Sequence, residues 1–238
     1  AESWPSIYLI IGITVLLIGI LTIFFLKEST VKSDGNKSLF RNIFYGFKPC
    51  VIKENQALYI TLIAFAIFGI SIQVFMPYLI LYYNVSLKMD NYVLIMAPAI
   101  IIAAIATAFY GRFYDKAGYF KSLMPALASL CIGYVLLYLF KGTVLVFAGS
   151  LLMMCGYLCG SAVFVAMISD KIPGNKAGMF QGLRIFGQVL IPGVIGPKIG
   201  AVVLKNAQIV IGDDGTKTFI PNENIFLAAL FIAAVLII

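Results

Sequence analysis

The sequence Gly-Arg-Phe-Tyr-Asp-Lys-Ala-Gly-Tyr-Phe-Lys, residues 111–121, is a short charged segment between two long uncharged ones. It contains three cations, one carboxylate and two glycines. The flanking runs, Asn91–Tyr110 and Ser122–Phe140, carry no charged residue. A charged turn between apolar runs of about 20 residues is typical of a short loop on one face of a membrane. The segment therefore predicts two membrane-spanning helices joined by a tight turn.

The composition of the whole chain also indicates a membrane protein. Of the 238 residues, 62% are hydrophobic and 11% are charged, and the mean hydropathy is +1.02. A soluble domain, which is about 45–50% apolar, cannot bury this much apolar surface. We expect an all-α polytopic protein in the lipid bilayer. The net charge of +7 is better explained by membrane topology than by nucleic-acid binding, because the cations lie in loops.

Seven apolar runs are candidates to cross the bilayer, which takes about 20 residues of helix. They are Pro5–Leu26, Ala57–Tyr83, Tyr92–Tyr110, Leu123–Phe140, Thr143–Ile168, Met179–Leu204 and Ile225–Ile238. Pro192 and Pro197 are expected to interrupt the sixth run. The seventh run has only 14 residues, so we expect the last helix to be truncated.

The distribution of lysine and arginine predicts the orientation. Eleven of these residues lie in alternate connections on one side: Lys27, Lys32, Lys37, Arg41, Lys48, Lys53, Arg112, Lys116, Lys121, Lys171 and Lys176. Four lie on the other side: Lys88, Lys141, Lys205 and Lys217. By the positive-inside rule the first set is cytoplasmic, so residues 27–56 and 111–122 are expected to face the cytoplasm and the amino end the outside.

Two connections have a pattern of their own. In the long connection, Leu39, Ile43, Phe44, Phe47, Val51 and Ile52 recur at helical spacing. This pattern fits either a short helix on the inner membrane surface or an ordinary connector packed against the bundle. On the outer side, Asp213-Asp214-Gly215 is a hairpin turn signal, which predicts two short strands around it.

The charged segment resembles the signature loop of the major facilitator superfamily. The matching residues are Gly111, Asp115, Lys116, Gly118 and Lys121, whereas Tyr119 and Phe120 stand where the family commonly has basic residues. This departure resembles the degraded second copy of the loop, between the eighth and ninth helices of the family. The resemblance implies that residues 1–26 are the last helix of an amino-terminal half. It makes residues 27–56 the central cytoplasmic loop and residues 57–238 the carboxy-terminal six-helix bundle.

A second stretch, residues 170–197, resembles the tenth-to-eleventh helix region of glycoside, pentoside and hexuronide cation symporters, especially bacterial ones. The resemblance implies a secondary transporter of the bacterial cytoplasmic membrane that moves a small polar solute, such as a sugar or glycoside, by alternating access. The resemblance of residues 111–121 to the major facilitator signature loop implies that the charged loop is a latch between the two halves. Asp115 is expected just beyond a helix end, where it can meet a helix amino end or an arginine. Gly111 and Gly118 are expected to let the backbones turn and approach closely.

Polar residues within the spans are candidates for the substrate pathway. Gln181, Arg184 and Gln188 are spaced by three and four, which places them on one helix face. This face suits sugar hydroxyls or a carboxylate, but Arg184 could instead reach the cytoplasmic surface or pair with Asp170. Three positions in the second span, Gln73, Tyr78 and Asn84, are candidates around the kink expected at Pro77, and Tyr157 is one in the fifth span. Such side chains can equally form interhelical hydrogen bonds.

Other functions receive less support from the residues. The chain has no histidine and no carboxylate within the spans, and the spacing of Cys155 and Cys159 suits packing. We therefore expect no enzyme activity, no metal site and no bound cofactor. A coupling proton or sodium ion would bind outside this chain, in the missing amino-terminal half. A drug or multisolute efflux transporter of the same superfamily and a seven-helix receptor remain alternatives.

Overall fold

The computed structural model describes residues 3–25, 45–89, 91–172, 177–205, 207, 209–211 and 217–237. The chain divides into two units, Ala1–Ser38 and Leu39–Ile238. Helix α1 (Ser3–Phe25) is the described part of the first unit. Two of its hydroxyls are satisfied by its own backbone, since Thr14 and Thr22 each donate to the carbonyl oxygen four residues earlier at 2.8 Å. Such internal bonding suits a helix in lipid, where no water is available to polar groups.

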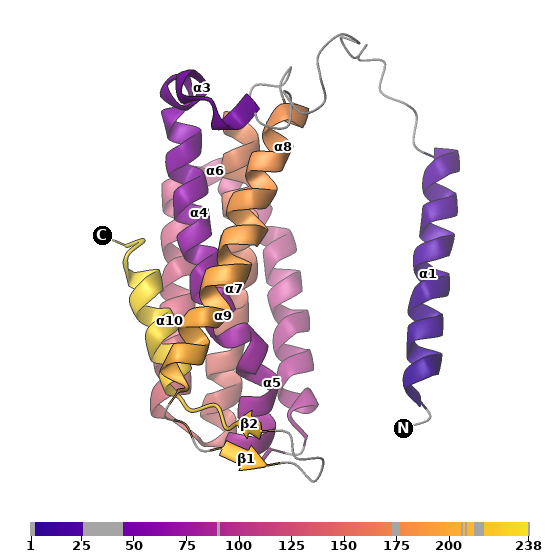
Figure 1. Ribbon diagram of the computed structural model, residues 1–238, viewed down its shortest axis with the longest axis vertical. Helices are drawn as coiled ribbons and strands as arrows, with labels where there is room; N and C mark the ends of the chain where they lie inside the picture. Colours follow the sequence, from indigo (N-terminus) through magenta and orange to yellow (C-terminus); the bar gives the residue numbers. More distant parts are fainter. Residues whose placement is uncertain are drawn as a thin grey trace. The chain divides into compact units, whose positions relative to one another are not determined.

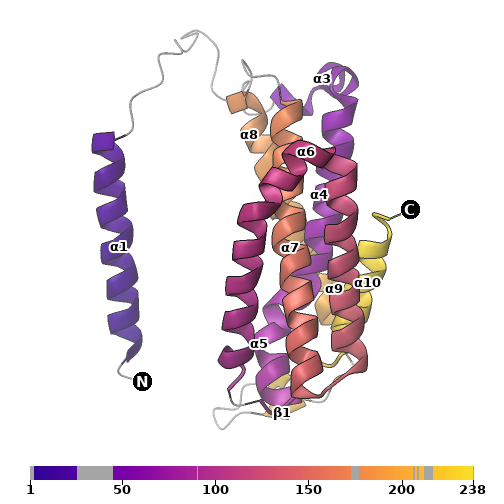
Figure 2. The ribbon, with the colours of Figure 1, turned by 180° about the vertical axis from the view of Figure 1, so that it is seen from behind.

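The second unit is a bundle of long apolar helices (Figures 1 and 2). After the 3-10 turn η1 (Tyr45–Phe47) come α3 (Pro49–Glu54), α4 (Gln56–Phe75) and a broken extension of α4. The extension consists of the 3-10 turn η2 (Met76–Tyr78), α5 (Leu79–Leu81) and the π-helical segment η3 (Tyr82–Ser86). Then follow α6 (Val93–Leu139) and α7 (Thr143–Lys171). The sixth predicted span consists of α8 (Ala177–Ile185), the π-helical segment η5 (Phe186–Leu190) and α9 (Ile191–Val203), and the unit ends with α10 (Asn224–Ala234).

Five helical stretches in the described chain are long and apolar enough to cross a membrane. One of them, α6, contains a break at Gly118, where φ is 78° and ψ is 173°. Figure 2 shows that the chain reverses there, so α6 contributes two limbs, residues 93–117 and 119–139. Together with the shorter α10, these elements coincide with the predicted spans. The all-α class is confirmed.

The charged segment differs from its prediction as a loop. Residues 111–117 continue the first limb of α6, and the reversal is concentrated at Gly118. The prediction that Asp115 lies beyond a helix end is therefore wrong, because Asp115 lies within the first limb of α6. Its side chain is exposed on this helix. The expected role of Gly111 is wrong too. It is helical, and a Cβ placed there would have no neighbour within 4 Å.

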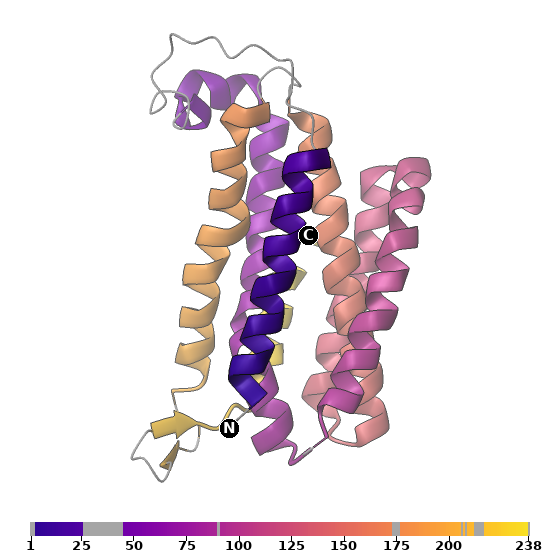
Figure 3. The same ribbon diagram turned by 90° about the vertical axis from the view of Figure 1, so that its right-hand side faces the viewer.

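Two other predictions about elements can be compared with the structure. The outer hairpin is confirmed, because β1 (Ile209–Ile211) pairs with β2 (Lys217–Phe219) in antiparallel register, while its turn lies outside the described residues. The pair lies at the end of the unit opposite α3 (Figure 3). Pro192 and Pro197 do not interrupt the sixth span. The chain passes through η5 into α9, which contains both prolines.

The described end of the long connection packs against the bundle. A Cβ at Gly46 would lie 3.3 Å from Leu183, and the rings of Phe47 and Phe186 meet edge to face at 5.5 Å. Tyr59 donates a hydrogen bond to the carbonyl oxygen of Gly46. These contacts favour the packed connector over the surface helix. Residues 39–44, the first part of the predicted surface helix, lie outside the described chain.

Basic residues gather at the end of the bundle that carries α3. Lys53 lies in α3, Arg112, Lys116 and Lys121 lie around the Gly118 turn, and Lys171 ends α7. Figures 1 and 2 place these elements at the same end. Lys88 and Lys141 lie in the connections at the opposite end, where Lys141 forms an ion pair with Glu223 at 3.5 Å. These seven loop cations, which lie in the described part of the chain, are thus grouped as the sequence predicted.

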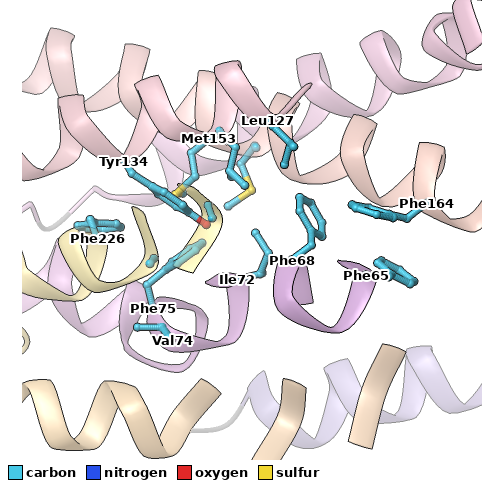
Figure 4. Packing of buried hydrophobic residues seen from close by; sticks show 14 of the residues in the cluster. Phe65, Phe68, Ile72, Val74, Phe75, Leu127, Tyr134, Met153, Phe164 and Phe226 are labelled. Carbon is cyan, nitrogen blue, oxygen red and sulfur yellow. The ribbon is translucent and has the colours of Figure 1, made fainter. Parts of the chain in front are cut away.

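Helix α4 is the central element of the bundle core. Its Phe65 and Phe68 rings lie 5.1 and 5.3 Å from Phe164 of α7, and Phe75 packs against Tyr134 of α6 at 5.4 Å. These rings and Phe226 of α10 form two aromatic groups within one hydrophobic core, and Ile72 lies between the groups (Figure 4). Buried hydroxyls add specific bonds to this apolar packing, since Ser71 donates to the carbonyl oxygen of Ala229 at 2.8 Å.

Glycines allow helix backbones to touch at two seams. A Cβ at Gly133 of α6 would lie 2.5 Å from the backbone nitrogen of Met153 in α7, and one at Gly156 would collide with the backbone of Leu130. Between α4 and α9, Gly69 faces Pro192, whose Cγ lies 2.7 Å from the position of an added Cβ, and Gly196 faces Gln73. Small residues at both seams therefore set the distance between helices.

We expect Gly156→Val to destabilise the protein, because the added side chain would push α7 away from the backbone of α6. Overpacking of this kind costs about 1–3 kcal/mol. Thermal unfolding of the full-length protein in detergent measures the loss. Gly193→Ala is the matched control, because a Cβ at Gly193 has no neighbour within 4 Å. Equal unfolding temperatures for the two variants would contradict the assignment of the seam.

Candidate functional site: a polar cavity between three helices

A cavity of about 80 Å³ lies between α4, α7 and the η5–α9 stretch. Its polar lining consists of Gln73, Tyr157, Ser161 and Gln188, and its apolar lining of Phe65, Phe68, Gly69, Ile72 and Pro192. All four polar side chains are half-buried. Figure 4 shows Phe65, Phe68 and Ile72 on α4. The cavity thus offers two amides and two hydroxyls, which are neutral groups that can donate and accept hydrogen bonds.

Three of the seven predicted pathway residues meet in this cavity: Gln73, Tyr157 and Gln188. Arg184 lies one helical turn from Gln188 and is linked to it, because its Nε donates to Gln188 Oε1 at 3.3 Å. Asp170, the alternative partner of Arg184, instead accepts a hydrogen bond from Tyr114 at 2.7 Å. Gln181 belongs to α8, but its side chain lies outside the part of the chain that the structure describes.

The other two predicted residues lie elsewhere. Tyr78 packs against α9, where its hydroxyl donates to the carbonyl oxygen of Pro197 at 3.4 Å. Asn84 is exposed in η3, which follows α5. In α7, Ser150 is buried and shares a 2.5 Å hydrogen bond with Tyr83, so it ties helices together. Ser161 of α7, which was not among the predicted site residues, lines the cavity.

A repeated pattern in the sequence marks the cavity, although it was not part of the sequence prediction. Gln73-Val-Phe-Met-Pro77 and Gln188-Val-Leu-Ile-Pro192 share the order Gln-Val, two apolar residues, Pro. Proline has no N–H to donate to the carbonyl group four residues earlier, which belongs to the glutamine in each case. Regular α-helix also changes next to each motif, into η2 after Gln73 and into η5 around Gln188. Local departures of this kind in a helix are frequent at functional sites.

The predicted latch residues surround the Gly118 turn at the other end of α7. Gly118 has the positive φ that favours glycine, and Asp115, Lys116 and Lys121 are exposed. Gly111 and Asp115 line a groove of about 130 Å³ together with Ala162 and Ala166 of α7. Asp115 has no hydrogen-bond or ion-pair partner among the described residues. Its carboxylate is therefore available to a group from outside this unit.

Tyr114 and Lys171 hold the turn against the end of α7. The Tyr114 hydroxyl donates to Asp170 Oδ2 at 2.7 Å, and Lys171 Nζ lies 5.2 Å from the centre of the Tyr119 ring. Desolvation raises the pKa of Tyr114, and the hydrogen bond to Asp170 and the charge of its carboxylate raise it further. Tyr114 therefore remains a protonated donor throughout the physiological pH range.

The long apolar helices, the polar cavity between them and the basic end of the bundle together define a polytopic membrane protein. The family model of the Major Facilitator Superfamily matches residues 1–197. The chain belongs to the Major Facilitator Superfamily, a family of membrane transporters, and is thus an integral multi-pass membrane protein. No curated protein and no solved structure matches the chain significantly.

Proposed function

We propose that this chain belongs to a secondary active transporter that moves a sugar, glycoside or similarly small polar solute across the cytoplasmic membrane by alternating access. The observation that carries the proposal is the meeting of Gln73, Tyr157, Ser161 and Gln188 in one cavity. A hydroxylated solute can exchange its bonds to water for bonds to these four groups. The rings of Phe65 and Phe68 in the same lining offer apolar contact to the faces of a sugar ring.

The size of the cavity supports the view that this chain supplies half of the binding site. Sites for small organic molecules commonly enclose about 300–1,000 Å³, and this cavity encloses about 80 Å³. We propose that the cavity forms one wall and that an amino-terminal half supplies the other. In this assignment α1 is the sixth helix of the transporter and the second unit is its carboxy-terminal half, as the resemblances of residues 111–121 and 170–197 imply. An acidic site for a coupling proton or sodium ion would lie in that other half.

The uptake test uses the full-length protein in cells without competing transporters, with labelled D-xylose, methyl β-D-glucoside and D-glucuronate. We expect Gln73→Ala and Gln188→Ala each to raise KM about three- to tenfold, as expected for the loss of one or two hydrogen bonds. Gln56→Ala is the matched control, because Gln56 is exposed at the start of the same helix α4 and should leave KM unchanged.

Drug efflux is a second candidate function, which the aromatic lining of the cavity favours. The uptake test also separates sugar transport from drug efflux. Export of a lipophilic cationic dye without uptake of any of the three sugars would exclude the sugar proposal. Unchanged KM in both glutamine variants would exclude the cavity as the solute site. Because a single half of a pore should not transport, net sugar flux by these 238 residues alone in liposomes would contradict the two-half assignment.

We further propose that the end of the bundle with α3 and the Gly118 turn faces the cytoplasm. The clustering of cations at this end supports the orientation, and Cys50 provides its test because the thiol is exposed in α3. A membrane-impermeant maleimide should label the protein in inside-out vesicles and leave it unlabelled in right-side-out vesicles. The hydrogen bond to Glu54 and the charge of Glu54 raise the pKa of the Cys50 thiol, so labelling at about pH 8.5 supplies more of the reactive thiolate.

Cys50→Ser should abolish the labelling, because Cys131, Cys155 and Cys159 lie within the spans and are at least half-buried. Labelling of the wild type in right-side-out vesicles alone would reverse the orientation.

The exposed carboxylate of Asp115 supports a latch role for the Gly118 turn. We propose that Asp115 contacts a cationic group or helix amino end of the amino-terminal half in one state of the transport cycle. Asp115→Asn in the full-length protein is expected to lower the maximal uptake rate several-fold with little change in KM, because Asp115 does not line the solute cavity. Lys53→Gln, which neutralises an exposed cation of α3 outside the Gly118 turn, is the control. A normal rate for Asp115→Asn would rule out the latch.

A further inference from the structure

The hydrogen bond between Arg184 and Gln188 fixes the orientation of a cavity-lining amide. Both residues lie on one face of the α8–η5 stretch, and Arg184 Nε donates to Gln188 Oε1 at 3.3 Å. Arginine can only donate hydrogen bonds, so the group that it meets on Gln188 must be the oxygen. Without this bond, the Gln188 amide could turn either its oxygen or its NH2 group toward the cavity. The bond to Arg184 occupies the oxygen and thereby fixes the orientation of the amide.

The other end of the same amide, the NH2 group, remains open. No hydrogen bond from Gln188 Nε2 is formed among the described residues. No fully buried side-chain nitrogen or oxygen in the described chain lacks a partner. Nε2 must therefore be accessible, and Gln188 is one of the residues that line the cavity. Bonding of a charged donor to Oε1 also polarises the amide, which strengthens its N–H groups as donors.

The remaining polar groups of the cavity do not impose such a direction. The hydroxyls of Tyr157 and Ser161 and the amide of Gln73 can each donate or accept. Among the four polar residues that line the cavity in the described chain, Gln188 is therefore the one whose amide is oriented by a hydrogen bond from a neighbouring side chain. A solute atom placed against Gln188 Nε2 has to be an acceptor, namely a hydroxyl, ether, carbonyl or carboxylate oxygen. An ammonium group, which has no lone pair to offer, is excluded there.

We propose that Arg184 is a positioning residue that holds Gln188 as a fixed donor, and that this wall of the cavity selects solutes with an oxygen acceptor. The inference rests on the proposed transport function and deepens it. In this inference Arg184 acts by orienting Gln188 and does not bind a carboxylate of the solute directly. The inference also explains why a charged side chain lies next to a cavity whose polar lining is neutral. A neutral sugar and a hexuronate both satisfy the requirement.

Substitutions of Gln188 test its hydrogen-bonding sense, with the three labelled sugars as probes. Gln188→Glu keeps the size and the acceptor for Arg184 but removes the donor, whereas Gln188→Met removes both. If Gln188 acts as a donor, the Glu variant should raise KM at least as much as the Met variant, by about three- to tenfold. A Glu variant with a KM nearer the wild-type value than that of the Met variant would show that the amide acts as an acceptor, which would overturn the proposal.

Substitutions of Arg184 test the positioning role. Arg184→Met should raise KM with little change in kcat, and Arg184→Lys, which keeps a cationic donor, should restore most of the affinity. In the Gln188→Met background, Arg184→Met should have no further effect on KM, because its action passes through Gln188. A full additional rise in the double variant would show that Arg184 contacts the solute itself.

A measurement without solute separates this inference from the transport proposal. If the wild type takes up none of the three sugars, the proposed function fails, but the Arg184–Gln188 pair is still tested by thermal unfolding. The shifts in unfolding temperature of Arg184→Met and Gln188→Met should then be less than additive in the double variant. Additive shifts would show that the two side chains do not interact, and the inference would be wrong whatever the protein transports.

Discussion

Contact between the backbones of neighbouring helices is the constraint on which this structure depends. Lipid tails are as apolar as leucine, so burying leucine between helices gains little over leaving it in lipid, and close packing has to hold the helices together. Gly133 and Gly156 bring α6 and α7 into backbone contact, and Gly69 and Gly196 bring α4 and α9 together. The aromatic core around α4 then fills the space between the two glycine seams.

The cavity exists where the second of these seams meets irregular helix. Pro192 packs against Gly69 and at the same time withholds a donor from the carbonyl of Gln188. The proline that packs against Gly69 in the seam is thus also the residue that loosens the regular bonding of the helix beside the cavity. A helix that is tightly packed on one side and irregular in its bonding can present polar groups at membrane depth without exposing them to lipid. This arrangement explains why the polar residues gather next to prolines and glycines.

The sequence was sufficient for the helices but only partly for the site. Because backbone polar groups in lipid must be hydrogen-bonded within the protein, apolar runs of this length form helices, and the spans could be predicted from hydropathy. The hairpin could be predicted from the turn residues Asp213-Asp214-Gly215. Gln73, Tyr157 and Gln188 could be singled out as polar residues in spans, but their meeting in one cavity depends on how three helices pack. Gly111 and Gly118 look alike in the sequence. A single reversal between two limbs needs one positive φ, and neither composition nor spacing indicates which glycine adopts it. The direction of the Gln188 amide depends on a tertiary arrangement of side chains and has no signal in the residue pattern alone.

The seam of Gly133 and Gly156 has a mechanical consequence. Backbone contact at two points about one helical turn apart joins the second limb of α6 and α7 into a stiff two-stranded rod. Such a rod resists bending, and the regular hydrogen bonding of α7 continues over its whole length. The softer members of the bundle are α4 with its 3-10 and π extension and the α8–α9 stretch with η5. If the cavity changes shape, the rod acts as the fixed wall and these two irregular helical stretches act as the moving ones, so the Gln-Val motifs lie at the hinges.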